Sequence, residues 1–159
     1  MLSQSETHNG HPIWQRIYQK LIYTDLEAMP TPEQVRAALE TLSPTKEKVD
    51  LAVKTAIEVA EPARVILFGS WARGEAKWDS DLDMAVLMPD SSLDQLGEVH
   101  RGIRRMLGKI PMSIDLVVTT LGTAEQFRGS INSIYHHILT QGQVVYERQP
   151  TYASANSSH

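Results

Sequence analysis

The chain has 159 residues and a formal net charge of −4, and 42% of its residues are hydrophobic, which is enough for one buried core. Acidic and basic residues are interspersed, so we expect no broad cationic face of the kind that follows a phosphate backbone, and direct binding to nucleic acid is disfavoured. The chain contains no cysteine and no long apolar run, which predicts a cytoplasmic protein without disulfides or a membrane segment.

The two ends of the chain differ from its middle. Residues 1–11 and 148–159 are polar and lack apolar periodicity, so we expect two disordered tails. Apolar residues recur at three- and four-residue spacing from Ile13 to Leu26, which predicts an amphipathic helix. We therefore divide the chain into a tail at 1–11, an N-terminal helical extension at 12–43, a main domain at 44–147 and a second tail at 148–159.

Two more helices are predicted before the first strand. Thr31 and Pro32 are typical of an N-cap and a first-turn proline, with Glu33 as a first-turn acid. The apolar face of that helix would carry Val35, Ala38, Leu39 and Leu42. A third helix is expected from about Pro44 to Ala60, ended by the sequence EPAR, and its buried stripe would carry Val49, Val53, Ile57 and Ala60.

Three short apolar segments are predicted to be strands. RVILF, residues 64–68, is apolar almost throughout, which is typical of a central strand covered on both faces. The second segment is DLDMAVLM, residues 81–88, and the third is MSIDLVV, residues 112–118. Alternation along a strand places Asp81, Asp83, Ala85 and Leu87 on one face of the second segment, Leu82, Met84, Val86 and Met88 on its other face, and Ser113, Asp115 and Val117 together on one face of the third.

The remaining segments complete an alternating pattern. A helix from about Ser92 to Leu107 would bury Leu93, Leu96, Ile103 and Leu107. A short helix is expected within residues 119–127, then a terminal helix in SINSIYHHILTQG with Gly142 as its cap, then a brief strand in QVVYE. The pattern predicts an α/β fold, a small mixed β-sheet flanked by helices with extra N-terminal helices. The sheet should be mixed because residues 69–80 barely reach the length that a parallel crossover needs.

The turn after the first strand is a candidate phosphate site. Gly69 would let the backbone approach an anion closely, and Ser70 would add a hydroxyl next to the N–H groups that open a helical turn. Ordinary turn chemistry is the alternative for this pair. Arg73, one helical turn later, either reaches the same phosphate or pairs with Glu75 or Asp79.

Acidic residues suggest a cation site beside that turn. Asp81 and Asp83 should share a strand face about 7 Å apart, at roughly 3.3 Å per residue. Partly desolvated carboxylates so close raise each other's pKa and call for a cation such as Mg²⁺. Asp115 would join them if the second and third strands are neighbours. The alternatives are a solvated strand start for the pair and the wet face of an edge strand for Asp115.

These residues carry a family resemblance. GSWARGEAKWDSDLD, residues 69–83, followed by SIDLVV, resembles the nucleotidyltransferase superfamily that includes DNA polymerase beta. It is most similar to the minimal nucleotidyltransferases, many of which are antitoxins paired with a HEPN-domain ribonuclease toxin. The resemblance implies the nucleotidyltransferase fold, with Gly69, Ser70 and Arg73 at the triphosphate of ATP and with Asp81, Asp83 and Asp115 as the catalytic residues and the ligands of two Mg²⁺ ions.

The resemblance also implies an activity. The chain would transfer AMP from ATP to a hydroxyl, with a tyrosine of a cognate HEPN toxin as acceptor, and would thereby act as an antitoxin. Asp115 would help to deprotonate the acceptor, and pyrophosphate would leave. Two alternatives stay open: an antitoxin that neutralises its toxin by binding alone, and an enzyme acting on a small molecule such as an aminoglycoside. A homo-oligomer is also compatible with the sequence.

Overall fold

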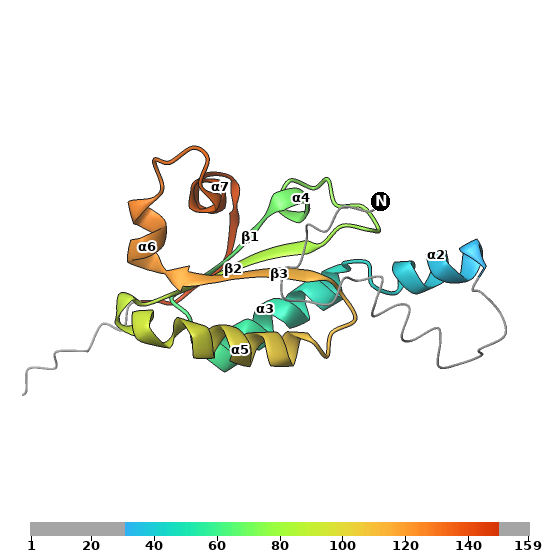
Figure 1. Ribbon diagram of the computed structural model, residues 1–159, viewed down its shortest axis with the longest axis horizontal. Coiled ribbons are helices and arrows are strands. Elements are labelled where there is room, and N and C mark those ends of the chain that lie inside the picture. The colour runs from blue at the N-terminus through green and yellow to red at the C-terminus, as the bar shows by residue number, and fades with distance from the viewer. Residues whose placement is uncertain (1–30, 150–159) are drawn as a thin grey trace, which may run out of the picture.

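The computed structural model describes residues 31–149, in which helices flank both faces of a four-stranded sheet (Figure 1). The strand order is β3-β2-β1-β4. β1 pairs antiparallel with β2 and with β4, whereas β2 and β3 are parallel. The predicted mixed α/β sheet is therefore confirmed. The strands are β1 Arg64–Phe68, β2 Leu82–Met88, β3 Ile114–Thr120 and β4 Gln143–Glu147.

The lengths of the connections explain the strand directions. Between β1 and β2 the chain forms only the one-turn helix α4, Gly69–Ala72, and a loop, which suits an antiparallel return. Between β2 and β3 it forms the 3-10 helix η1, Asp90–Gln95, and helix α5, Leu96–Leu107, which together give the long crossover that a parallel pair requires.

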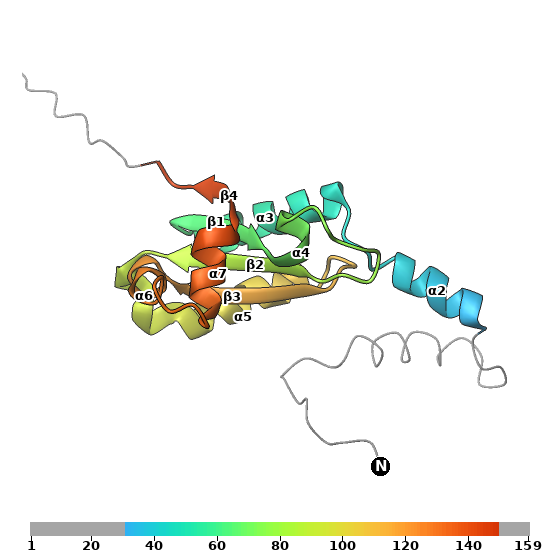
Figure 2. The same ribbon diagram turned by 90° about the horizontal axis from the view of Figure 1, so that it is seen from above.

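The second predicted helix is present as α2, Pro32–Glu40. The backbone N–H of Gln34 donates to Thr31 Oγ1 at 3.2 Å, and the backbone N–H of Thr31 donates to Gln34 Oε1 at 2.8 Å, so the predicted N-cap is confirmed as a capping box. The helix extends away from the sheet (Figure 2). Its four predicted apolar residues are half-buried, although Leu42 lies past the helix end. The helix predicted from Ile13 to Leu26 lies outside the described residues.

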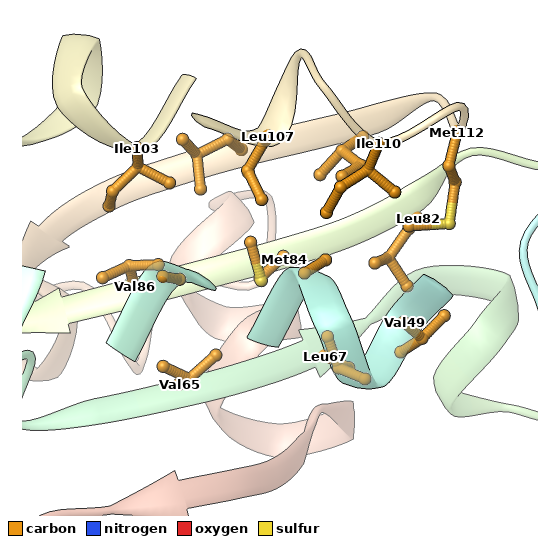
Figure 3. Close-up of a cluster of buried hydrophobic side chains, with 14 of the residues drawn as sticks. Val49, Val65, Leu67, Leu82, Met84, Val86, Ile103, Leu107, Ile110 and Met112 are labelled. Carbon is orange, nitrogen blue, oxygen red and sulfur yellow. The ribbon is translucent and has the colours of Figure 1, made fainter. Parts of the chain in front are cut away.

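One face of the sheet is covered by α3, Lys46–Ala60, and by α5 (Figure 1). Figure 3 shows side chains of this core from β1, β2 and both helices meeting between the layers. The buried stripe of α3 is Val49, Ala52 and Ala56, because the two small alanines allow the helix to approach the sheet closely. Of the predicted stripe, therefore, only Val49 is fully buried, while Val53, Ile57 and Ala60 flank the contact.

The start of α5 departs from the sequence prediction. Leu93 was expected on the buried side of a helix beginning near Ser92, but it is 57% exposed. The chain runs as η1 up to Gln95, and 3-10 geometry rotates side chains by a different angle per residue than an α-helix does. The prediction for Leu93 is therefore wrong, whereas Ile103 and Leu107 are buried as expected.

The other face carries α4, α6, Leu121–Gln126, and α7, Ile134–Gln141 (Figure 1). Alternation along β2 is confirmed, because Ala85 and Leu87 pack on this face with Ala124 of α6 and Ile138 of α7. The terminal helix starts later than predicted, since Ser133 caps it. Ile131 thus precedes the helix and is 72% exposed. No helix within residues 31–149 is long and apolar enough to cross a membrane.

Gly142 provides a test of how tightly this second layer packs. A Cβ on Gly142 would overlap Ile138 O and Ile66 Cγ2, at the point where α7 turns into β4. We expect Gly142→Ala to lower the free energy of unfolding by roughly 2–4 kcal/mol, measured by urea denaturation. Gly129→Ala is the control, since open space surrounds Gly129, and it should change stability by about 0.5 kcal/mol or less. Equal effects of the two substitutions would contradict the packing.

Candidate functional site

Two carboxylates face each other across the parallel strands. Asp83 of β2 is the direct register partner of Asp115 of β3, and the backbone N–H of Leu82 donates to Ser113 O at 2.9 Å beside them. Neighbouring strands lie about 4.8 Å apart, and register partners in a parallel ladder point to the same face. Asp83 is half-buried and Asp115 is exposed, so the pair lies where the helical layer leaves the sheet open to solvent.

Electrostatics at this pair favour a cation. Burial, followed by the negative charges of Asp115 and Asp81, raises the pKa of Asp83, the positive charge of Arg73 lowers it, and the net result is a pKa of about 6. Removing a carboxylate from water and placing other anions beside it both disfavour its ionised form. A positive ion that bound here would relieve both costs at once.

Asp81, the first of the two predicted strand acids, is held by a loop. It lies one residue before β2 and is exposed. The backbone N–H of Lys77 donates to Ser80 Oγ at 2.8 Å, and Ser43 Oγ donates to Trp78 O at 2.7 Å, which anchors the loop to the segment before α3. Sequence reasoning did not identify Ser43, because it contacts a residue far away in the chain, and it gave no role to Ser80, although Ser80 lies within the motif at residues 69–83.

Gly69 has a specific steric role next to Asp83. Its φ is +67°, in the left-handed region that favours glycine, and a Cβ here would overlap the Oδ2 atom of Asp83. The sequence predicted that Gly69 makes room for a bound anion, and the anion found against it is the protein's own carboxylate. The missing side chain therefore lets the Gly69-Ser70 turn lie directly against the Asp83 carboxylate.

The other two residues predicted to bind phosphate lie within this turn and just after it. Ser70 is half-buried in α4, and Arg73 is the exposed C-cap residue of that helix. Arg73 Nε pairs with Glu75 Oε2 at 2.8 Å, which is one of the two alternatives foreseen for this arginine. Contact of Gly69, Ser70 and Arg73 with a phosphate stays a prediction.

The acidic residues suit a divalent cation that shares its ligands with a substrate. Within residues 31–149, no three Asp, Glu or His side chains gather closely enough to hold a metal ion by themselves. Mg²⁺, however, is commonly bound by one or two carboxylates together with water and substrate phosphates. The register pair of Asp83 and Asp115 supplies hard oxygen donors of this kind. The donor set therefore fits Mg²⁺ that arrives with a phosphorylated substrate.

Comparison with known proteins gives a match to a family and similarity to solved structures. Residues 47–151 match the family model described as "Polymerase beta, Nucleotidyltransferase". A search of curated proteins finds no match. Among solved structures, the chain is similar to one described as "Crystal structure of the toxin-antitoxin with AMP-PNP", with 22% sequence identity, 63% of this chain and 74% of that chain covered, and a TM-score of 0.37.

The contact between Gly69 and Asp83 can be tested by two matched substitutions. Gly69→Ala introduces both an unfavourable φ and an overlap with Asp83, whereas Gly74→Ala, at φ +70° with open space around it, introduces only the first. We expect losses in unfolding free energy of roughly 3–4 kcal/mol for Gly69→Ala and about 1 kcal/mol for Gly74→Ala, measured by urea denaturation. In an Asp83→Ala background the two losses should converge. A Gly69→Ala loss unaffected by Asp83→Ala would rule out the contact.

The pKa of Asp83 predicts how stability changes with pH. Folding raises this pKa from 3.8 to about 6, so the folded state holds the proton more tightly than the unfolded state. The contribution of protonated Asp83 to the free energy of unfolding is therefore fully present below about pH 4. It is lost as the pH rises through about 6, and the loss is on the order of 1–2 kcal/mol after allowance for solvent screening. Asp83→Asn should remove this loss in thermal scans with EDTA. The exposed η1 carboxylate Asp94, changed to Asn, controls for removal of one charge. If the stability of wild type and of Asp83→Asn changed with pH in the same way, the raised pKa of Asp83 would be contradicted.

Proposed function

The chain belongs to the polymerase beta nucleotidyltransferase family, and from this premise we propose that it transfers AMP from ATP to a hydroxyl group in a reaction that depends on Mg²⁺. The observation that carries the proposal is the register pairing of Asp83 with Asp115 directly beside the Gly69-Ser70 turn. This arrangement supports a site in which phosphate oxygens and carboxylates can share metal ions.

Each acidic residue has a role in the proposed reaction. Asp81 and Asp83 would hold two Mg²⁺ ions, with Asp115 completing the site. When bound, the ions would supply neutralisation of the triphosphate charge and a lower pKa for the acceptor hydroxyl. Asp83 is half-buried, so water competes less for its carboxylate. Ser70 and Arg73 would orient the phosphates by hydrogen bonds.

The proposed step exchanges one phosphorus–oxygen bond for another. The acceptor oxygen attacks the α-phosphorus of ATP, the bond from that phosphorus to the β-phosphate bridging oxygen breaks, and pyrophosphate leaves. Asp115 accepts the proton of the attacking hydroxyl. Its exposure supports this role, because an acceptor carried on the surface of another protein can reach an exposed carboxylate.

We further propose that the acceptor is a tyrosine of a cognate HEPN ribonuclease toxin and that the chain acts as its antitoxin. The support is the resemblance of residues 69–83 and of SIDLVV to minimal nucleotidyltransferases. Modification of the toxin would then neutralise it. Neutralisation by binding alone and transfer to a small molecule are the competing functions, and they are separate outcomes of the experiment below.

The experiment incubates the chain with α-labelled ATP, Mg²⁺ and the purified toxin, and mass spectrometry weighs the products. We expect the toxin to gain AMP, and we expect Asp81→Asn and Asp83→Asn each to reduce labelling by on the order of 100-fold or more while leaving complex formation intact. Asp94→Asn, outside the site, should label as wild type does.

The controls separate the alternatives. If the Asp81→Asn, Asp83→Asn double variant still protects cells from the toxin as well as wild type, neutralisation by binding replaces the enzymatic proposal. Label that appears only on an added small molecule such as an aminoglycoside would instead identify the third function.

A further inference from the structure

The ion pair between Arg73 and Glu75 differs from two other arginine–glutamate pairs in the described part of the chain. Arg64 donates to Glu147 from both Nε and Nη2, and Arg128 donates to Glu125 from both Nε and Nη2. Arg73 donates to Glu75 from Nε alone, at 2.8 Å. The terminal nitrogens of Arg73 make no hydrogen bond to any residue within 31–149, so this guanidinium keeps the two-pronged end that binds phosphate or carboxylate oxygens.

The backbone places this pair against the Gly69-Ser70 turn. The backbone N–H of Arg73 donates to Gly69 O at 3.3 Å, and the backbone N–H of Glu75 donates to Ser70 O at 2.9 Å. Between them, Gly74 has a φ of +70°, in the left-handed region that favours glycine, directly after the C-cap of α4. Both side chains of the ion pair therefore start from positions tied by hydrogen bonds to the two residues of the turn.

A carboxylate at this position needs an explanation. If the turn binds a triphosphate, Glu75 places a negative charge close to an anionic ligand, because its backbone is bonded to Ser70 of the turn, and this is unfavourable for binding. An arginine side chain, however, loses about 2 kcal/mol of rotamer entropy when it is immobilised. A partner that already holds Nε reduces the part of this cost that falls on ligand binding. The position of Glu75 is therefore explained if its contact with Nε orients Arg73.

We propose that Glu75 is a positioning residue: it accepts a hydrogen bond from Arg73 Nε and so orients the terminal nitrogens of Arg73 toward a phosphate of the bound nucleotide. This inference rests on the proposed function, because it requires a nucleotide at the turn. It adds Glu75 to that site as a residue that does not touch the nucleotide but acts through Arg73. The pair is exposed, so its contribution is modest and is best measured as a change in affinity.

The test is titration calorimetry of the full chain with ATP and Mg²⁺, in the absence of an acceptor. We expect Glu75→Ala to raise the Kd by roughly two- to fivefold. Glu40→Ala is the matched control, since Glu40 also contacts an exposed arginine, Arg36, through Nε alone at 3.0 Å, and it should leave the Kd unchanged. Thermal scans should show similar stability for the two variants.

Non-additivity distinguishes positioning from a general structural effect. In an Arg73→Gln background, Glu75→Ala should cause no further weakening, because no guanidinium is left to orient. With an acceptor present, Glu75→Ala should raise KM and leave kcat nearly unchanged. An unchanged or lower Kd for Glu75→Ala, or an equal loss with and without Arg73, would overturn the assignment of Glu75. If the wild-type chain binds no ATP in the presence of Mg²⁺, the proposed function itself fails, and this inference fails with it.

Discussion

The pairing of β2 with β3 in parallel register is the constraint on which the rest of this molecule depends. A parallel ladder sets residues side by side on the same face, so the register alone brings Asp83 next to Asp115. A shift of one residue would turn Asp115 into the opposite core, where an unpaired carboxylate is very costly. The long crossover through α5 makes this parallel pairing possible, and the apolar alternation of β2 secures its orientation.

The two helical layers have different roles: one stabilises the sheet, and the other leaves the acidic end of the sheet accessible. α3 and α5 cover one face with a continuous apolar core (Figure 3), and this core holds the strands in register. On the opposite face, α6 and α7 pack against Ala85 and Leu87, farther along β2 than Asp83. The start of β2 and β3 is thus left to α4 and its loop. Strands that one face stabilises can therefore carry repelling charges on the other.

Glycine and charge act together at this end of the sheet. Among the glycines within residues 31–149, Gly69 is the only one at which a Cβ would collide with the Asp83 carboxylate. Because glycine has no side chain, the backbone of the turn can lie directly against this carboxylate. The cost appears in the raised pKa of Asp83, which reflects burial and the two neighbouring aspartates. Folding thus buries the Asp83 carboxylate and places two other carboxylates near it, which is unfavourable when no cation is bound. A bound cation would offset both effects, so the arrangement is suited to binding one.

Local patterns along the chain determined much of this protein before any contact was known: the cap at Thr31, the alternation in β2, the apolar β1 and the mixed sheet all follow from spacing and from short-range sterics. The same reasoning failed at Leu93 and missed the role of Ala52 and Ala56, because helix type and the distance between helix and sheet depend on neighbours. The motif residues were likewise visible in sequence. Only the tertiary structure decided that Asp115 lies opposite Asp83, that Gly69 yields space to that acid and that Arg73 pairs with Glu75, since strand register and side-chain partners are set by packing between distant segments.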